Sequence, residues 1–125
     1  MIDYLSYEDV VQVAAGIMDH VVVSDAGLLA SAVLRPQVTV SGEDAYPALA
    51  DKAAALLHGI ARNHALADGN KRLAWASARV FLLMNGYSVA YDVDDAEAMV
   101  VGVAGGDIEV PHVADWLRSR MTVVA

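Results

Sequence analysis

The side chains best suited to catalysis or ligand binding lie together between residues 64 and 72, where the sequence reads His-Ala-Leu-Ala-Asp-Gly-Asn-Lys-Arg. We expect a helix to begin near Asp68, so Lys71 and Arg72 fall in its first turn. The partial positive charge of a helix N-terminus makes each of these cations unfavourable by roughly a few tenths of a kcal/mol. Two cations in this place make sense if an anion binds there. Gly69 allows a tight turn whose N–H groups can hold phosphate oxygens.

Two further side chains in this segment add the chemistry of group transfer. Asp68 brings a carboxylate beside the turn, where it can bind a Mg²⁺ ion that bridges two phosphates. His64 lies near the end of the preceding helix, and its reference pKa of about 6.5 lets it accept a proton from an incoming hydroxyl. The segment therefore predicts an electrostatic clamp for a nucleotide polyphosphate.

Each of these residues also has an ordinary structural interpretation. His64 can cap the last carbonyl groups of its helix, and Asp68 can be a plain helix N-cap. Asn70 can hydrogen-bond the local turn, while Lys71 and Arg72 can be solvated charges on an exposed face. The interpretation as a nucleotide site depends on their occurrence together within nine residues.

The segment resembles the core motif of the Fic/Doc family, which is written H-x-F-x-[D/E/N]-[G/A]-N-[K/G]-R. The resemblance continues through residues 27–32, 35–37, 46–47, 52–54 and 85–87, so it covers most of the chain. The short length is similar to that of the Doc (death-on-curing) branch, which is close to the bare helical core of the fold. The matching motif positions are His64, Asp68, Gly69, Asn70, Lys71 and Arg72.

The resemblance implies phosphoryl transfer from ATP, with Mg²⁺, to a protein hydroxyl. Doc-like proteins are the toxins of toxin–antitoxin pairs, and their implied target is a threonine of elongation factor Tu, whose phosphorylation inhibits translation. The resemblance makes His64 the general base and Asp68 a Mg²⁺ ligand. The other motif residues hold the phosphates and neutralise charge on the transferring group. These are Gly69 and Asn70 for the anion hole, and Lys71 and Arg72 for the charge.

Two positions depart from the wider family motif. Members that transfer AMP have glycine at the position of Lys71, and commonly a second arginine where this chain has Trp75. A lysine removes room for a diphosphate and adds a point charge, which favours a kinase over an AMP transferase. Leu66 replaces the usual phenylalanine. Leucine buries less area, so we expect a retained fold with a looser loop.

The loop from Val38 to Asp44 corresponds to the family's flap, which aligns the target segment by β-type pairing. The alternation of Val38, Thr39 and Val40 allows this role, and an ordinary exposed loop is the alternative. The family's autoinhibitory motif, [S/T]-x-x-x-E-[G/N], is not found, since the closest match has Asp44 at its last position. The resemblance therefore implies inhibition in trans by a separate antitoxin protein.

We expect the chain to form one all-α domain over residues 1–125, a compact bundle of about six helices with a short β-like flap and an extended connector over residues 87–93. The capping residues, prolines and glycines set the expected bounds. The helices run from a capping box at Ser6 to about His20; from a cap at Asp25 to a stop at Pro36; from Pro47 in the first turn past Ile60; from near Asp68 to Asn85-Gly86; from a cap at Asp94 or Asp95 to Gly105-Gly106; and from Pro111 to about Met121.

Composition excludes several other classes of function. The net charge of −8 and a pI near 4.6 argue against direct nucleic-acid binding. No apolar run approaches the length of a membrane span, and the N-terminus is unlike a signal peptide, so we expect a cytoplasmic protein without a membrane partner. The absence of cysteine excludes zinc–thiolate sites and thiol nucleophiles.

Two alternatives to a kinase remain open. The first is an AMP or other nucleotidyl transferase of the Fic type, against which Lys71 argues. The second is a catalytically silent helical domain that only binds a partner protein, against which the intact motif argues.

Overall fold

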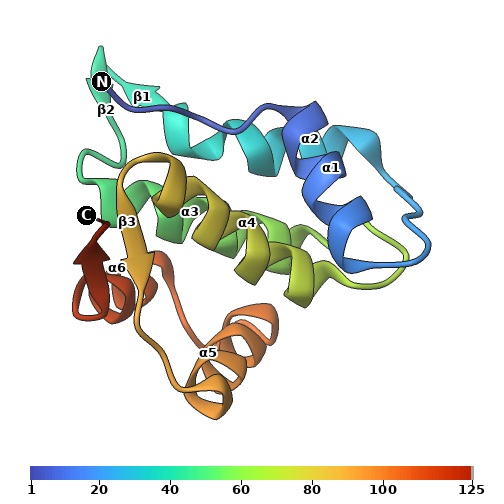
Figure 1. The fold of residues 1–125 in the computed structure, drawn as a ribbon. Helices are drawn as coiled ribbons and strands as arrows, with labels where there is room; N and C mark the ends of the chain where they lie inside the picture. The colour runs from blue at the N-terminus through green and yellow to red at the C-terminus, as the bar shows by residue number, and fades with distance from the viewer. Residues whose placement is uncertain (125) are drawn as a thin grey trace.

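The computed structural model describes residues 1–124, and over this range the chain forms six α-helices, a 3₁₀ turn and two small antiparallel sheets (Figure 1). The predicted all-α class is therefore confirmed. Within the described residues, no helix has both the length and the apolar character needed to cross a membrane. The elements are α1 Tyr7–Ile17, α2 Ala26–Leu34, η1 Arg35–Gln37, β1 Thr39–Val40, β2 Glu43–Asp44, α3 Leu49–Asn63, α4 Asn70–Met84, β3 Tyr87–Val89, α5 Val93–Ala104, α6 Val110–Arg118 and β4 Met121–Val123.

The long helix α3 lies at the centre of the molecule. It packs against α2, α4, α5, α6 and η1, with α1 and α2 on one side of the α3–α4 pair and α5 and α6 on the other (Figure 1). Its alanine-rich sequence allows close approach, because small side chains bring helix axes together. Gly59 shows how close: a Cβ added there would lie 3.2 Å from the Cβ of Ala32 on α2. A helix surrounded in this way holds both of its ends in fixed positions.

Two predicted helix caps are confirmed, and a third is wrong. Ser6 and Asp9 form a reciprocal capping box on α1, and the Asp25 side chain accepts a hydrogen bond from the N–H of Leu28 on α2. The cap of α5 is Asp92 rather than Asp94 or Asp95, since the Asp92 carboxylate accepts from the N–H of Asp95. The two later aspartates lie inside the first turn, where the helix dipole favours negative charge.

The ends of α1 and α2 differ from the predicted boundaries because the residues after each helix take part in other structure. Helix α1 ends at Ile17 rather than near His20, since the following residues leave to contact the segment between α3 and α4. Pro36 does not end α2 abruptly, because the chain continues through η1 with this proline at its start.

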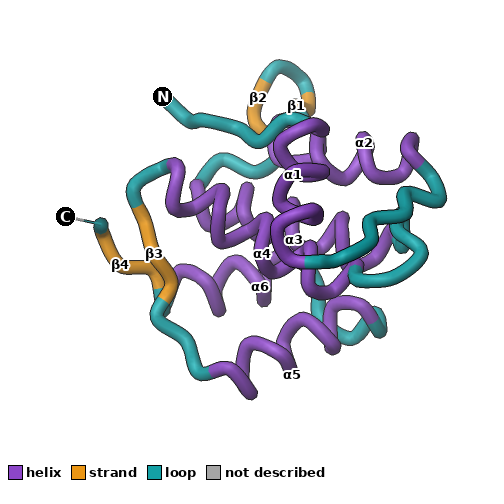
Figure 2. The backbone as a smooth tube through the Cα atoms, turned by 45° about the vertical axis from the view of Figure 1, so that its right-hand side comes forward, coloured by secondary structure: helices purple, strands orange, loops and turns teal. Residues whose placement is uncertain are grey.

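The C-terminal end contains a strand that the sequence did not predict. Helix α6 begins at Val110 and ends at Arg118, short of Met121. Residues 121–123 form β4, which pairs antiparallel with β3 after α4, and Figure 2 shows the two strands side by side. Of the extended connector expected over residues 87–93, the first three residues form β3, one half of this small sheet, while Val93 already belongs to α5.

The central position of α3 predicts a large difference between two leucines. Leu57 on α3 is fully buried, so Leu57→Ala should lower the free energy of unfolding by about 2–5 kcal/mol through lost packing and a cavity. Leu83 on α4 is 57% exposed, and Leu83→Ala should change it by less than about 0.5 kcal/mol. Urea unfolding of both variants measures the difference, and equal losses would contradict the central role of α3.

Candidate active site

The loop between α3 and α4 is held by the connector between α1 and α2, which lies beside it (Figure 1). The carbonyl of Ala65 accepts hydrogen bonds from the N–H groups of Ser24 and Asp25, at 2.8 and 3.1 Å. The N–H of Ala67 donates to the carbonyl of Val22 at 2.9 Å. These backbone contacts give the loop a fixed path. No motif in the sequence predicts a role for this connector in the site.

Leu66 anchors the same loop from inside. Its side chain is only 4% exposed, and its backbone forms a β-bridge with Val23 of the connector. The side-chain amide of Asn70 binds both polar atoms of the Leu66 backbone. The N–H donates to Oδ1 of Asn70 at 2.9 Å, and Nδ2 donates to the Leu66 carbonyl at 3.0 Å. Leucine therefore suffices to close this side of the loop, and Asn70 acts by shaping the turn.

Gly69 sets the direction in which α4 leaves the loop. Its φ of 87° favours glycine, and it is the N-cap of α4 without any side-chain cap. A Cβ at this position would meet Sδ of Met18, the C-cap residue of α1, so a side chain here would displace that thioether. The turn therefore needs glycine on conformational grounds, whereas the flexible Met18 side chain could move to admit a Cβ.

The N-terminus of α4 presents backbone donors to solvent. The N–H groups of Asn70, Lys71 and Arg72 belong to the first turn, where a helix supplies no partner. No acceptor from another segment of residues 1–124 binds them. The N–H of Gly69, also expected in the cradle, instead donates to Oδ1 of its neighbour Asp68 at 2.8 Å. Three adjacent donors thus remain for an anion.

His64 lies at the junction between α3 and this turn. It is the C-cap of α3 in the left-handed conformation, with φ 51° and ψ 44°, and it is exposed. For a non-glycine residue this conformation costs about 1 kcal/mol. Within residues 1–124, no hydrogen bond or ion pair engages the imidazole, so the ring does not cap the helix carbonyls. The ring is free to act on a group brought to the site.

The charged residues of the motif are exposed and unpaired. Lys71 and Arg72 form no ion pair with any carboxylate in the described part of the chain, and neither does Asp68 with any cation. Asp68 is not the N-cap of α4, because Gly69 has that position. In a protein of net charge −8, two free cations at a helix N-terminus concentrate positive potential at one point.

A cleft of about 470 Å³ extends from the two cations along α4 and α5. Trp75 lies one helical turn beyond Lys71 and lines it together with Tyr91, whose ring centroid is 4.9 Å from that of Trp75 in an edge-on arrangement. Glu97 of α5 adds a carboxylate to the opposite wall. This cleft was not predicted from the sequence, although the i, i+4 spacing of Lys71 and Trp75 places them on one helix face.

The expected flap is a formed β-hairpin. Thr39 and Val40 make β1, Glu43 and Asp44 make β2, and Val38 immediately precedes the first strand. All residues from 38 to 45 are exposed. The hairpin projects from the helices near the N-terminal segment (Figure 2). The predicted β character of Val38, Thr39 and Val40 is therefore confirmed for the latter two.

The double hydrogen bond of Asn70 predicts a measurable stabilisation. Asn70→Ala leaves two buried backbone groups of Leu66 without partners, so the free energy of unfolding should fall by about 2–3 kcal/mol. Asn63→Ala is the matched control, since Asn63 makes a single exposed hydrogen bond to the Leu28 carbonyl. Denaturant titration compares them. An equal effect of the two substitutions would show that Asn70 does not hold the loop.

The left-handed conformation of His64 predicts an unusual effect of glycine. His64→Gly removes the Cβ penalty at the helix C-cap, so its free energy of unfolding should exceed that of His64→Ala by up to about 1 kcal/mol. Thermal unfolding of both variants at equal pH makes the comparison. If the glycine variant were the less stable one, the conformation would carry no strain.

Comparison with known proteins adds the identity of the family. The chain matches the Fic/DOC family over residues 4–82. It is 52% identical over 119 residues to a protein named Toxin Doc from Mycolicibacterium smegmatis, with 91% of this chain and 90% of that protein covered. It is 39% identical over 95 residues to Protein kinase doc from Escherichia phage P1, with 76% and 74% covered. With the motif placed on an exposed turn as the resemblance implied, the chain belongs to the Fic/Doc family.

Proposed function

We propose that this protein is a Doc-type toxin that transfers the γ-phosphoryl group of ATP to a hydroxyl of a target protein. The observation that carries the proposal is the short turn that joins the exposed imidazole of His64 to a helix N-terminus bearing two cations, all three without ion-pair partners among residues 1–124. The names of the two relatives, a toxin and a protein kinase, support it. The expected target is a threonine of elongation factor Tu, so the outcome is inhibited translation.

The chemistry follows from the site's own groups. The imidazole of His64 takes the proton of the attacking hydroxyl, whose oxygen forms the new bond to phosphorus. The three free N–H groups of the α4 turn and the side chains of Lys71 and Arg72 neutralise charge on the transferring group as the bond to the β-phosphate oxygen breaks. ADP leaves with that oxygen. General-base catalysis of this kind contributes about 10²–10⁴ to the rate.

Asp68 fits a role in binding Mg²⁺ together with ATP. One of its carboxylate oxygens accepts the Gly69 N–H, and the other forms no hydrogen bond or ion pair with the described residues. No cluster of three or more acidic or histidine side chains within residues 1–124 could hold a metal unaided. Mg²⁺ commonly takes one or two carboxylates plus substrate phosphates, so a single free oxygen beside a phosphate cradle suits it. The ion would supply further neutralisation of the phosphates.

The α4–α5 cleft offers a place for the rest of the nucleotide. Its volume of about 470 Å³ lies within the usual range for small-molecule sites. Lys71 and Arg72 stand at its edge and Trp75 and Tyr91 form an aromatic wall, so the phosphates would meet cations and the aromatic face of the base would meet aromatic rings. Lys71 stands where AMP-transferring members have glycine, which supports delivery of the γ-phosphate over delivery of AMP.

A separate antitoxin completes the proposal. A protein named as a toxin at 52% identity supports a toxin–antitoxin pair for this chain too. Because the sequence has no match to the family's autoinhibitory motif, inhibition would come in trans from that partner.

The test incubates the purified protein with elongation factor Tu, Mg²⁺ and ATP and records the intact mass of the factor. We expect a phosphate-sized gain in mass. In His64→Ala the rate at which the phosphorylated factor appears should be about 10²–10⁴-fold lower, because the general base is lost. His112→Ala is the matched control, since His112 is an exposed histidine of α6 outside the motif.

Other outcomes identify the alternatives. A gain the size of AMP would keep His64 as base but assign the chain to nucleotidyl transfer. No gain, with ATP binding demonstrated, would overturn elongation factor Tu as the target. Absence of ATP binding would favour the catalytically silent, partner-binding domain.

A further inference from the structure

The hairpin β1–β2 cannot hold its own position. Each strand has only two residues, and residues 38–45 are all exposed. An isolated two-stranded hairpin is marginally stable at best in water. Its turn, through Ser41 and Gly42 at φ 54° and 82°, sets its local twist but not its direction relative to the helices. Contacts at the base of the hairpin must therefore fix its orientation.

A single buried ammonium group lies at that base. Lys52 of α3 is 1% exposed, and its Nζ lies 3.2 Å from Oδ2 of Asp44 on β2. The same atom donates to the carbonyl of Pro36, just before β1, at 3.5 Å, and it lies 5.6 Å from the ring centroid of Tyr4. Lys52 thus contacts the chain on both sides of the hairpin. Burial lowers the pKa of Lys52, but its contacts with Tyr4 and Asp44 outweigh this and hold the pKa above its ordinary value.

A second polar contact joins the residues that flank the hairpin, Arg35 before it and Tyr46 after it. Nε of Arg35 donates to the hydroxyl of Tyr46 at 3.1 Å, so residues on either side of the hairpin are bonded to each other. Nη1 of Arg35 lies 2.8 Å from Nδ1 of His58, which is also on α3. Helix α3 therefore holds the hairpin through Lys52 and His58, and the same helix ends at His64.

Stability alone does not explain a charge in this position. Burying an ammonium against a half-exposed carboxylate gains little net energy, and well-packed apolar side chains in place of such pairs are often neutral or stabilising. What Lys52 supplies that an apolar side chain cannot is a directed bond to two separate segments. These directed bonds fix the orientation of the hairpin relative to α3 and add little to the free energy of folding.

We propose that Lys52 is the positioning residue of the hairpin, holding both of its ends to α3, the helix that ends at His64, so that β1 is presented, already formed, to the backbone of the protein substrate. This inference rests on the proposed function for the role of the substrate. What is new is the residue, Lys52, that sets how the hairpin is oriented toward the substrate. Lys52 touches neither nucleotide nor target and acts through Asp44 and Pro36.

The test compares Lys52→Met with the parent protein by two readouts. Hydrogen exchange follows the N–H of Ala45, which donates to the Val38 carbonyl at 2.9 Å across the base of the hairpin. We expect its exchange to become about tenfold faster or more, while the melting temperature stays equal or rises. In the phosphorylation assay, the KM for the protein substrate should rise about five- to tenfold with little change in kcat or in the KM for ATP.

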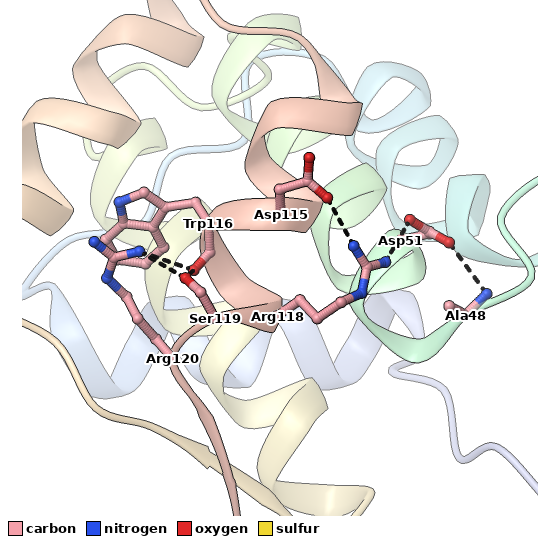
Figure 3. Close-up of polar contacts among 7 residues, drawn as sticks. All are labelled: Ala48, Asp51, Asp115, Trp116, Arg118, Ser119 and Arg120. Carbon is pink, nitrogen blue, oxygen red and sulfur yellow. Dashed lines mark hydrogen bonds and ion pairs between the residues drawn. The ribbon is translucent and has the colours of Figure 1, made fainter.

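Two further variants make the result specific. Lys52→Arg keeps a cation, so its KM for the protein substrate should stay close to that of the parent protein. Arg118→Met removes a different ion pair of α3, that of Arg118 with Asp51 at 3.2 Å, which lies on the side facing α6 (Figure 3). This control should leave both the hairpin exchange and the substrate KM unchanged.

The two proposals fail in different ways. Unchanged exchange at Ala45 in Lys52→Met would overturn the anchoring role, whatever the enzyme does. Faster exchange with an unchanged substrate KM would overturn the role in docking. If the parent protein bound no ATP and transferred no phosphate to elongation factor Tu, the proposed function would fail, while the exchange data would still decide whether Lys52 holds the hairpin.

Discussion

The amide of Asn70 and the backbone of Leu66 exchange two hydrogen bonds, and the geometry of the whole site depends on this contact. It closes the loop between α3 and α4 into one shape, with Leu66 buried underneath and the α1–α2 connector bonded alongside. With the loop closed, α4 begins with its free N–H groups outward and His64 stands at the edge of the same turn. Side-chain hydrogen bonds to backbone are among the few local means of fixing an irregular segment.

Helix α3 connects the two parts of the structure that the proposed function needs, the hairpin and His64. It binds the hairpin near its start, through Lys52 and His58, and it delivers His64 at its end. Lys52 and His64 are separated by roughly 18 Å along the axis at about 1.5 Å per residue. Because α3 is packed on several sides, this separation is rigid. A substrate strand aligned by the hairpin would therefore meet the imidazole at a fixed place.

Electrostatics and strain both concentrate at the same turn. The protein is acidic overall, yet Lys71 and Arg72 stand without ion-pair partners among the described residues, in a place where the helix dipole disfavours them. His64 adds a left-handed conformation that an ordinary C-cap would give to glycine. Neither feature improves folding. Both suit the proposed site, in which an anion binds and an imidazole acts as base beside it.

Local sequence determined the helices, their caps at Ser6 and Asp25, and the grouping of the motif between His64 and Arg72, because capping and turn chemistry act within a few residues. Only the tertiary structure decided which residues far along the chain support that motif. Met18 under Gly69, the connector beside Ala65, β4 pairing with β3 and the Lys52–Asp44 ion pair all join segments whose relative positions come from packing. A pattern along one segment has no information about such neighbours, since their proximity is a property of how the helices fill space.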